Sequence, residues 1–182
     1  RIRKIVISTG VVTTLAGSTQ GYTDATGTSA RFNTPEGITT DGTNLYVVDY
    51  GNNRIRKIVI DNGTVTTLAG SSSGSTDATG TSARFNNPWE ITTDGTNLYV
   101  VENGNHTIRK IVIDNGTVTT LAGTAGSSGS TDATGTSARF SSPAGITTDG
   151  TNLYVTDRNN HTIRKIVIDN GTVTTLAGTA GS

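Results

Sequence analysis

The sequence contains no cysteine and no methionine, and only three prolines and one tryptophan. Without cysteine, the chain forms neither a disulfide framework nor a thiolate metal site. The lack of cysteine does not fix the compartment, but it suits an extracellular or bacterial cell-surface protein. No apolar run approaches the length of a membrane span, so we predict no membrane insertion. No signal peptide is recognisable, and because the chain opens on Arg1 we expect a mature form or a fragment.

Hydrophobic residues are also few, at 32% of the chain, and aromatic residues make up only 5%. Such a chain cannot fill one large core, whereas thin repeated layers need less apolar material. Charge is balanced, with 14 basic and 14 acidic residues, and each unit carries both signs. A balanced, dispersed charge creates no long-range field that attracts a polyanion. We therefore predict no nucleic-acid partner.

What the sequence does contain is repetition. A seven-residue segment rich in Ile, Val, Arg and Lys recurs at intervals of 53, 53 and 55 residues. It occupies residues 1–7, 54–60, 107–113 and 162–168. An Ala-Arg-Phe motif recurs only three times, at residues 30–32, 83–85 and 138–140. The chain is therefore a tandem array of three full units preceded by the second half of another.

Four short strands fit one unit. In the first full unit we predict strands at residues 37–40, 45–48, 54–60 and 64–69. An Asp-Gly-Thr-Asn turn follows the first strand, and a polar turn follows the second. The dipeptide Asn62-Gly63 predicts a two-residue hairpin turn before the fourth strand, because both residue types tolerate positive φ angles. No window places apolar residues at helical spacing over three turns, so we expect no helix.

Four antiparallel strands per unit are typical of a propeller blade, which stacks on its neighbours because it cannot bury both faces alone. We predict an all-β fold, a β-propeller of four-stranded antiparallel blades, with three complete blades and a half blade. The predicted boundaries are 1–17 for the half blade and 18–70, 71–123 and 124–182 for the blades, which together form one propeller domain or segment. A β-solenoid is the alternative, but its coils are usually much shorter.

Three segments of the unit resemble the NHL repeat. They are Phe-Asn-Thr-Pro-Glu-Gly-Ile at 32–38, Asn-Leu-Tyr-Val-Val-Asp at 44–49 and Gly-Asn-Asn-Arg-Ile-Arg-Lys at 51–57. The turn that names the family reads Asn-Asn-Arg once and Asn-His-Thr twice, so its third residue is never Leu. The resemblance covers the chain apart from its Ser-, Gly- and Thr-rich connectors. It implies a propeller of the bacterial repeat-protein type with near-identical blades. It implies no particular activity, because the fold hosts many.

The connectors share the sequence Thr-Asp-Ala-Thr-Gly-Thr-Ser-Ala-Arg-Phe. We expect its Phe to anchor the connector between blades and its Arg to bond loop carbonyls. Its acidic residues are Asp24, Asp77 and Asp132. One carboxylate per loop is a poor calcium site, so we expect each Asp to cap its own turn instead.

The two edges of each blade differ in how strictly they repeat. In a propeller, the entry to the first strand and the turn between the second and third strands open on one edge. The Asp-Gly-Thr-Asn turn, on the other edge, is identical in all three units. The candidate binding residues on the varying edge are Glu36, Tyr50, Trp89, Glu90, Asn103 and Arg158. Trp, Tyr and Arg are common anchors of binding sites, but loops also drift where packing constrains them little, and both interpretations stay open.

A catalytic interpretation has little support. His106 and His161, with Asp49, Glu102 and Asp157, could imitate the metal site that some NHL-type lyases and propeller hydrolases hold at the channel mouth. A zinc site, however, needs three or four ligands around one point. The sequence shows no nucleophile with a base and no phosphate-binding loop before a helix. We predict no catalytic residue, no metal site and no cofactor.

Three functional hypotheses follow. The first is a non-catalytic scaffold that binds a protein or ligand, as one segment of a longer repeat protein. The second is a self-assembling array, natural or engineered, because the half unit leaves one blade without its inner strands. Two chains would then close a ring of about six blades, and the N-terminal hairpin would exchange with its near copy in the last unit. The third is a metal-dependent lyase or hydrolase. The expected partners are a second copy of the chain or another protein.

Overall fold

The computed structural model describes residues 1–180, which form fourteen strands in four antiparallel sheets. The N-terminal hairpin pairs β1 (Ile2–Ile5) with β2 (Val12–Ala16). Blade 1 consists of β3 (Pro35–Thr40), β4 (Asn44–Asp49), β5 (Arg54–Val59) and β6 (Val65–Ala69). Blade 2 consists of β7 (Pro88–Thr93), β8 (Asn97–Glu102), β9 (Thr107–Val112) and β10 (Val118–Ala122). Blade 3 consists of β11 (Pro143–Thr148), β12 (Asn152–Asp157), β13 (Thr162–Val167) and β14 (Val173–Ala177).

The strands of each blade pair in chain order, so every blade is an antiparallel meander. This confirms the predicted all-β fold of three four-stranded blades and a two-stranded half blade. Five three-residue 3₁₀ turns connect the strands, and no α-helix occurs between residues 1 and 180. They are η1 (Gly27–Ser29), η2 (Tyr50–Asn52), η3 (Gly80–Ser82), η4 (Gly135–Ser137) and η5 (Arg158–Asn160). None of the helices in this part of the chain is long and apolar enough to cross a membrane.

The second strands of blades 1 and 2 are buried on both faces, which explains their continuous apolar sequence. In β4, Tyr46 and Val48 point toward blade 2, whereas Val47 points toward the N-terminal hairpin. All three side chains are fully buried. Alternation along β4 therefore packs blade 1 between the N-terminal hairpin and blade 2.

The hairpin turn between β5 and β6 differs from the prediction. Val59 N donates to Thr64 O at 3.0 Å, so the turn contains the four residues 60–63 rather than two. Only Gly63 of the Asn-Gly dipeptide has a positive φ, at 71°. The Asn62 side chain instead accepts a hydrogen bond from Thr64 N at 2.9 Å, which stabilises the longer turn locally. The prediction of a two-residue turn was therefore wrong.

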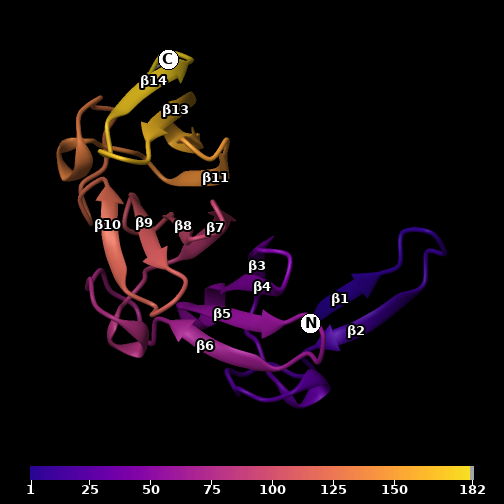
Figure 1. The fold of residues 1–182 in the computed structure, drawn as a ribbon. Coiled ribbons are helices and arrows are strands. Elements are labelled where there is room, and N and C mark those ends of the chain that lie inside the picture. Colours follow the sequence, from indigo (N-terminus) through magenta and orange to yellow (C-terminus); the bar gives the residue numbers. More distant parts are fainter. Residues whose placement is uncertain (181–182) are drawn as a thin grey trace.

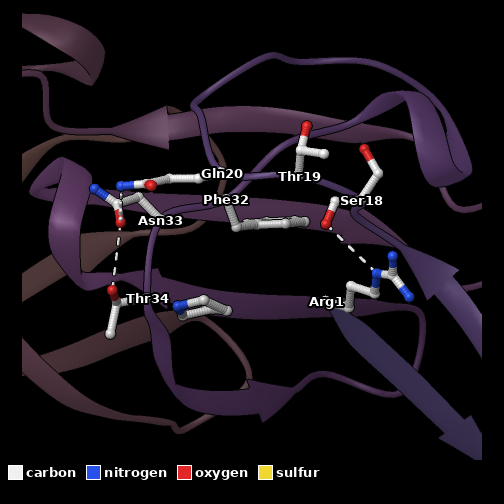
Figure 2. A pocket seen from close by; sticks show the side chains of 8 residues that line it. Arg1, Ser18, Thr19, Gln20, Phe32, Asn33 and Thr34 are labelled. Carbon is white, nitrogen blue, oxygen red and sulfur yellow. Dashed lines mark hydrogen bonds between the residues drawn. The ribbon is translucent and has the colours of Figure 1, made fainter.

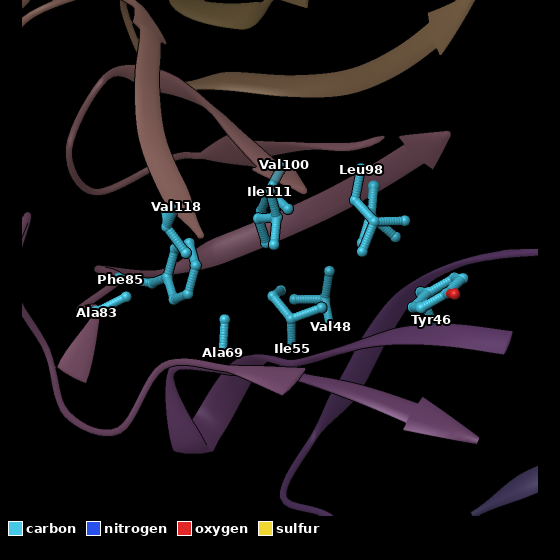
Figure 3. Packing of buried hydrophobic residues seen from close by; sticks show 11 residues of the cluster. Tyr46, Val48, Ile55, Ala69, Ala83, Phe85, Leu98, Val100, Ile111 and Val118 are labelled. Atoms are coloured by element: carbon cyan, nitrogen blue, oxygen red, sulfur yellow. The ribbon is translucent and has the colours of Figure 1, made fainter. Parts of the chain in front are cut away.

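The core lies between blades, not within them (Figure 3). From blade 1, Ile55 and Ala69 face blade 2, and from blade 2, Phe85 and Leu98 face back toward them. All four are fully buried. Equivalent residues form the core between blades 2 and 3. Each interface is thin and mostly aliphatic, in keeping with the low aromatic content.

The blades follow one another around an open arc (Figure 1). The inner strands β3, β7 and β11 contact one another in sequence along its inner side. Blade 3 and the N-terminal hairpin form the two ends of the arc and lie apart from each other. The described chain thus forms a curved segment of a propeller and does not close a ring on itself.

Candidate functional site

Each blade contains a buried arginine on its third strand. Arg56 is fully buried, and its Nη1 donates to Asp49 Oδ2 at 2.8 Å. Its Nη2 donates to Asp24 Oδ1 at 2.5 Å, and the guanidinium also bonds the carbonyls of Thr23 and Arg31. The guanidinium carbon lies 5.0 Å from the centre of the Phe32 ring. One side chain therefore ties the connector, the end of β4 and β5 together.

The same arrangement recurs in blades 2 and 3, around Arg109 and Arg164. In blade 2 the inner acid is Glu102, whose carboxylate accepts from Asn86 N, Asn105, Thr107 and Arg109. Burial raises the pKa of Glu102, while the Arg109 charge and these donors act in the opposite direction. These inner acids, which sequence analysis considered as metal ligands, are already bound to arginine.

Two expectations about the connector need correction. The carboxylate of Asp24 does not cap its own turn: it pairs with Arg56 and accepts from Thr67 N of β6 at 2.9 Å. In blade 1 the strand arginine Arg56, not the connector arginine, bonds the connector carbonyls of Thr23 and Arg31. Among the connector arginines, Arg139 does bond two loop carbonyls, those of Thr136 and Ala138. The predicted burial of the connector Phe between blades is confirmed.

The edge with identical turns is held by short local hydrogen bonds. Asp94 accepts from Thr96 N at 2.8 Å, from Asn97 N at 2.7 Å and from the Tyr99 hydroxyl at 2.7 Å. Burial by itself raises the pKa of Asp94, but these hydrogen bonds outweigh it and hold the pKa below its usual value. The carboxylate thus replaces the missing backbone partners of a tight turn, which accounts for its identity in every unit.

The opposite edge, which we call the variable edge, carries the six predicted binding residues: Glu36, Tyr50, Trp89, Glu90, Asn103 and Arg158. The structure brings two of them together. Tyr50 of η2 and Trp89 of β7 lie in an edge-to-face contact across two blades, with ring centroids 5.5 Å apart and an interplanar angle of 85°. Trp89 remains 36% exposed. The pair therefore presents aromatic surface to solvent where neighbouring blades meet.

The other four residues do not join this pair. The Glu90 side chain bonds its own strand: its Oε1 accepts a hydrogen bond from Ile91 N at 3.1 Å. Asn103 donates to Pro143 O of the next blade at 3.3 Å. Glu36 and Arg158 are exposed at the two ends of the arc, on β3 and η5. Their role in binding remains a prediction.

A contact that sequence analysis missed links neighbouring blades at this edge. Asn53 Oδ1 accepts from Asn87 N at 3.2 Å, and in the next interface His106 Nδ1 accepts from Ser142 N at 3.0 Å. Asn53 and His106 both have positive φ, at 52° and 60°. The signal was present in the Asn-Asn and Asn-His turns, because Asn and His both tolerate this conformation and both offer an acceptor.

No group of three or more His, Asp and Glu side chains within residues 1–180 is placed to hold a metal ion. His106 and His161 occupy equivalent turns of neighbouring blades. His106 Nδ1 bonds the next blade, whereas the His161 side chain is exposed at the end of the arc. The two imidazoles do not converge.

A pocket of about 360 Å³ lies where the N-terminal hairpin meets blade 1 (Figure 2). Its lining residues are Arg1, Ser18, Thr19, Gln20, Phe32, Asn33, Thr34 and Pro35. Thr34 in this lining is the equivalent of Asn87, whose backbone N–H is bonded by Asn53. In the two interfaces between blades, the turn after the second strand of the preceding blade occupies the equivalent space. The pocket is therefore open because no such turn precedes blade 1 in the described residues.

The chain is similar to a known repeat family and to several longer proteins. Residues 140–166 match the model of the NHL repeat. NHL repeat-containing protein 2 of Bos taurus is 32% identical over 141 residues, which are 71% of this chain and 19% of that protein. The chain thus spans about a fifth of the length of the curated relatives it matches.

Solved structures show the same architecture. An auxiliary nutrient binding protein from Bacteroides thetaiotaomicron superposes with a TM-score of 0.66 at 20% identity, covering 93% of this chain and 38% of that one. A streptogramin B lyase superposes with a TM-score of 0.56 at 20% identity, covering 81% of this chain and 41% of that one. At such identities the likeness shows the fold alone.

Proposed function

The chain belongs to the NHL-repeat family, and from this we propose that it is a non-catalytic propeller module that binds a protein or another ligand at its variable edge. The relatives extend far beyond the matched region, so the proposed binding role concerns the matched blades alone.

The observation that carries this proposal is the Tyr50–Trp89 pair. Edge-to-face packing holds both rings in place, so little side-chain entropy remains to be lost when a ligand binds. Trp89 is the only tryptophan, and the equivalent positions hold Glu36 and Ala144. A residue needed for blade packing would recur in every unit, as Phe85 does. Trp and Tyr are also the residue types that dominate binding energies.

The single tryptophan provides the test. We would titrate the full chain with a panel of soluble peptides and oligosaccharides while recording Trp89 fluorescence, and confirm each response by calorimetry. Binding is expected to shift the emission, and Trp89→Ala is expected to weaken the calorimetric affinity at least about tenfold.

The matched control is Thr96→Ala on the opposite edge, because Thr96 is exposed and its side chain is remote from Trp89. This variant should bind as the natural chain does. If Trp89→Ala leaves the affinity of every responding ligand unchanged, the Tyr50–Trp89 pair is not the binding site.

A further inference from the structure

We propose that a second copy of this chain docks head to tail, so that blade 3 of one copy packs on blade 1 of the next. The pattern for this contact lies inside the chain, where blade 1 packs on blade 2 and blade 2 on blade 3 through equivalent residues. The contact does not include the Tyr50–Trp89 pair. Failure of ligand binding and failure of association are therefore distinguishable.

The free side of blade 3 repeats a surface that is covered elsewhere. This trailing face consists of Tyr154, Thr156, Ile163, Leu176 and Ala177, the equivalents of Tyr46, Val48, Ile55, Leu68 and Ala69 in blade 1. Ile55 is fully buried against blade 2, whereas Ile163 is 36% exposed. Leu176 is 56% exposed. Blade 3 thus ends in a mostly apolar sheet face of the kind that twice binds a following blade in this chain, with Thr156 where blades 1 and 2 have valine.

The free side of blade 1 is the complementary surface. Ile38 on β3 is 47% exposed, whereas its equivalent Ile91 in blade 2 is only 3% exposed. Leu45 is partly buried, whereas its equivalent Leu98 is fully buried. The inner half of this leading face therefore lacks the cover that blade 1 itself gives to blade 2.

The N-terminal hairpin covers only the outer half of the leading face. Ile2 and Ala16 pack on Phe32, in the places that Ile55 and Ala69 take on Phe85. A docking blade needs these same places for Ile163 and Ala177, so it must displace the hairpin. The exchange is favourable in area, because a blade brings four strands where the hairpin brings two. In the described chain, β1 pairs with β2 alone and leaves its inner edge free.

The turn contacts at the variable edge are complementary as well. Asn53 and His106 each bond the backbone N–H of the residue before the next blade's proline. His161 is the next member of this series, with a φ of 55°, close to those of Asn53 and His106. The N–H that it would bond in a second copy is that of Thr34, which lines the open pocket.

The charges at this edge also match. Tyr50 and Trp89 show which two positions meet when one blade follows another. The corresponding positions at the ends of the arc are Arg158 on blade 3 and Glu36 on blade 1, and both are exposed. Docking therefore places an arginine beside a glutamate. The two end faces are therefore complementary in apolar side chains, in hydrogen bonding and in charge, as docking of a second copy requires.

The first test is the mass in solution. Light scattering on the full chain over a wide concentration series is expected to show masses that rise from the 18.8 kDa of one chain toward multiples of it. Ile163→Asp should weaken association at least about a hundredfold, because docking would bury an unpaired carboxylate. Thr119→Asp is the matched control, because it adds the same charge at an exposed position of blade 2. A mass of one chain at every concentration, or equal effects of the two variants, would overturn the proposal.

The second test addresses the geometry. Arg158→Glu and Glu36→Arg should each weaken association about two- to fivefold, and the double variant should recover the lost affinity. His161→Ala should weaken it too, whereas His161→Asn should not, because Asn53 makes the same contact within the chain. A double variant weaker than both single variants would show that the ends do not meet in this register.

The third test separates displacement of the hairpin from docking beside it. Ile2→Asp loosens the hairpin from Phe32 and is expected to strengthen association several-fold, with circular dichroism showing that the blades remain folded. If Ile2→Asp weakens association as Ile163→Asp does, the hairpin belongs to the interface, and the proposed exchange is wrong.

Discussion

At the residue scale, the guanidinium of Arg109 lies inside blade 2 and binds two acids and two carbonyls. Its Nη1 is 2.8 Å from Glu102 Oε2 and 3.1 Å from Arg84 O, and its Nη2 bonds Asp77 and Thr76 O. The sequence predicted a strand here but not a buried charge. In the segment Ile108-Arg-Lys-Ile111, a charged residue is normally assigned to the solvent face.

Replacing this arginine tests how much the network contributes. Arg109→Met should lower the free energy of unfolding by about 3–5 kcal/mol, because it leaves the buried Glu102 carboxylate without its counter-ion. Arg109→Met combined with Glu102→Met should recover part of the loss, since no buried charge remains. Urea unfolding followed by circular dichroism measures both.

The matched control is Arg84→Met, because the Arg84 side chain is exposed. Its effect should stay within about 0.5 kcal/mol. A double variant less stable than Arg109→Met alone would contradict the explanation from an unpaired buried charge.

The turn aspartates make stability depend on pH. The pKa of Asp94 is lower in the folded chain than its unfolded value of about 3.9, so its contribution is present above about pH 4 and is lost as the pH falls through the depressed pKa. Asp94→Asn keeps an acceptor for the turn but has no charge to lose. The stability gap between this variant and the natural chain should therefore narrow between pH 7 and pH 3.

Urea unfolding at several pH values measures this gap. Asp114→Asn serves as the control, because it removes the same charge at an exposed position. A gap for Asp94→Asn that is constant with pH would show that the carboxylate charge does not stabilise the turn.

At the element scale, strand positions were predictable to within one or two residues, whereas connections were not. The period-two pattern and the turn residues located all four strands of a blade. The Asn62-Gly63 turn was misjudged because its geometry depends on where β5 and β6 separate, which the dipeptide alone does not reveal. The partners of Asp24 lie 32 and 43 residues away, and no local pattern points to them.

Substitution of two glycines with similar φ angles distinguishes the stability cost of backbone strain from that of a steric clash. Gly70 and Gly95 have φ angles of 91° and 89°. A Cβ at Gly70 would collide with Asn53 O and lie 2.8 Å from the Phe85 ring, whereas one at Gly95 would meet nothing within 4 Å. Gly95→Ala should lower the free energy of unfolding by about 1–2 kcal/mol, because of the left-handed backbone alone. Gly70→Ala should cost at least about 1–3 kcal/mol more.

Thermal or urea unfolding of both variants provides the comparison. Equal losses in the free energy of unfolding would mean that the chain at residue 70 can move away from Phe85 at little cost. The close approach between blades would then not require glycine at this position.

At the scale of the whole molecule, sequence periodicity identified the propeller fold and its half blade, but not how exposed each equivalent residue is. The repeats are nearly identical, yet Ile38 and Ile91 differ in exposure because their neighbours differ. The candidate site shows the same limit. Sequence comparison selected Tyr50 and Trp89 separately, and only the arc places them in contact.

The N-terminal hairpin should be the least stable part of the described arc. Its two strands share one backbone ladder, and its Val12 is 47% exposed, whereas Val65 of β6 is 1% exposed. Amide hydrogens of β1 and β2 should exchange with solvent faster than those of β5 and β9. Exchange measured by mass spectrometry on peptides from each strand tests this. Equal protection in β1 and β9 would show that the hairpin does not open independently.

The near identity of the interfaces also has a consequence for folding. A hairpin that fits the leading face of blade 1 fits those of blades 2 and 3 almost as well, because all three are formed by the same side chains. We therefore expect refolding chains to populate arrangements in which blades pair out of order, and correction of these errors to add a slow phase. The Tyr50–Trp89 contact belongs to one pairing only, so Trp89→Ala should enlarge that slow phase in stopped-flow circular dichroism. An unchanged amplitude would mean that blade order is set by the covalent connectors alone.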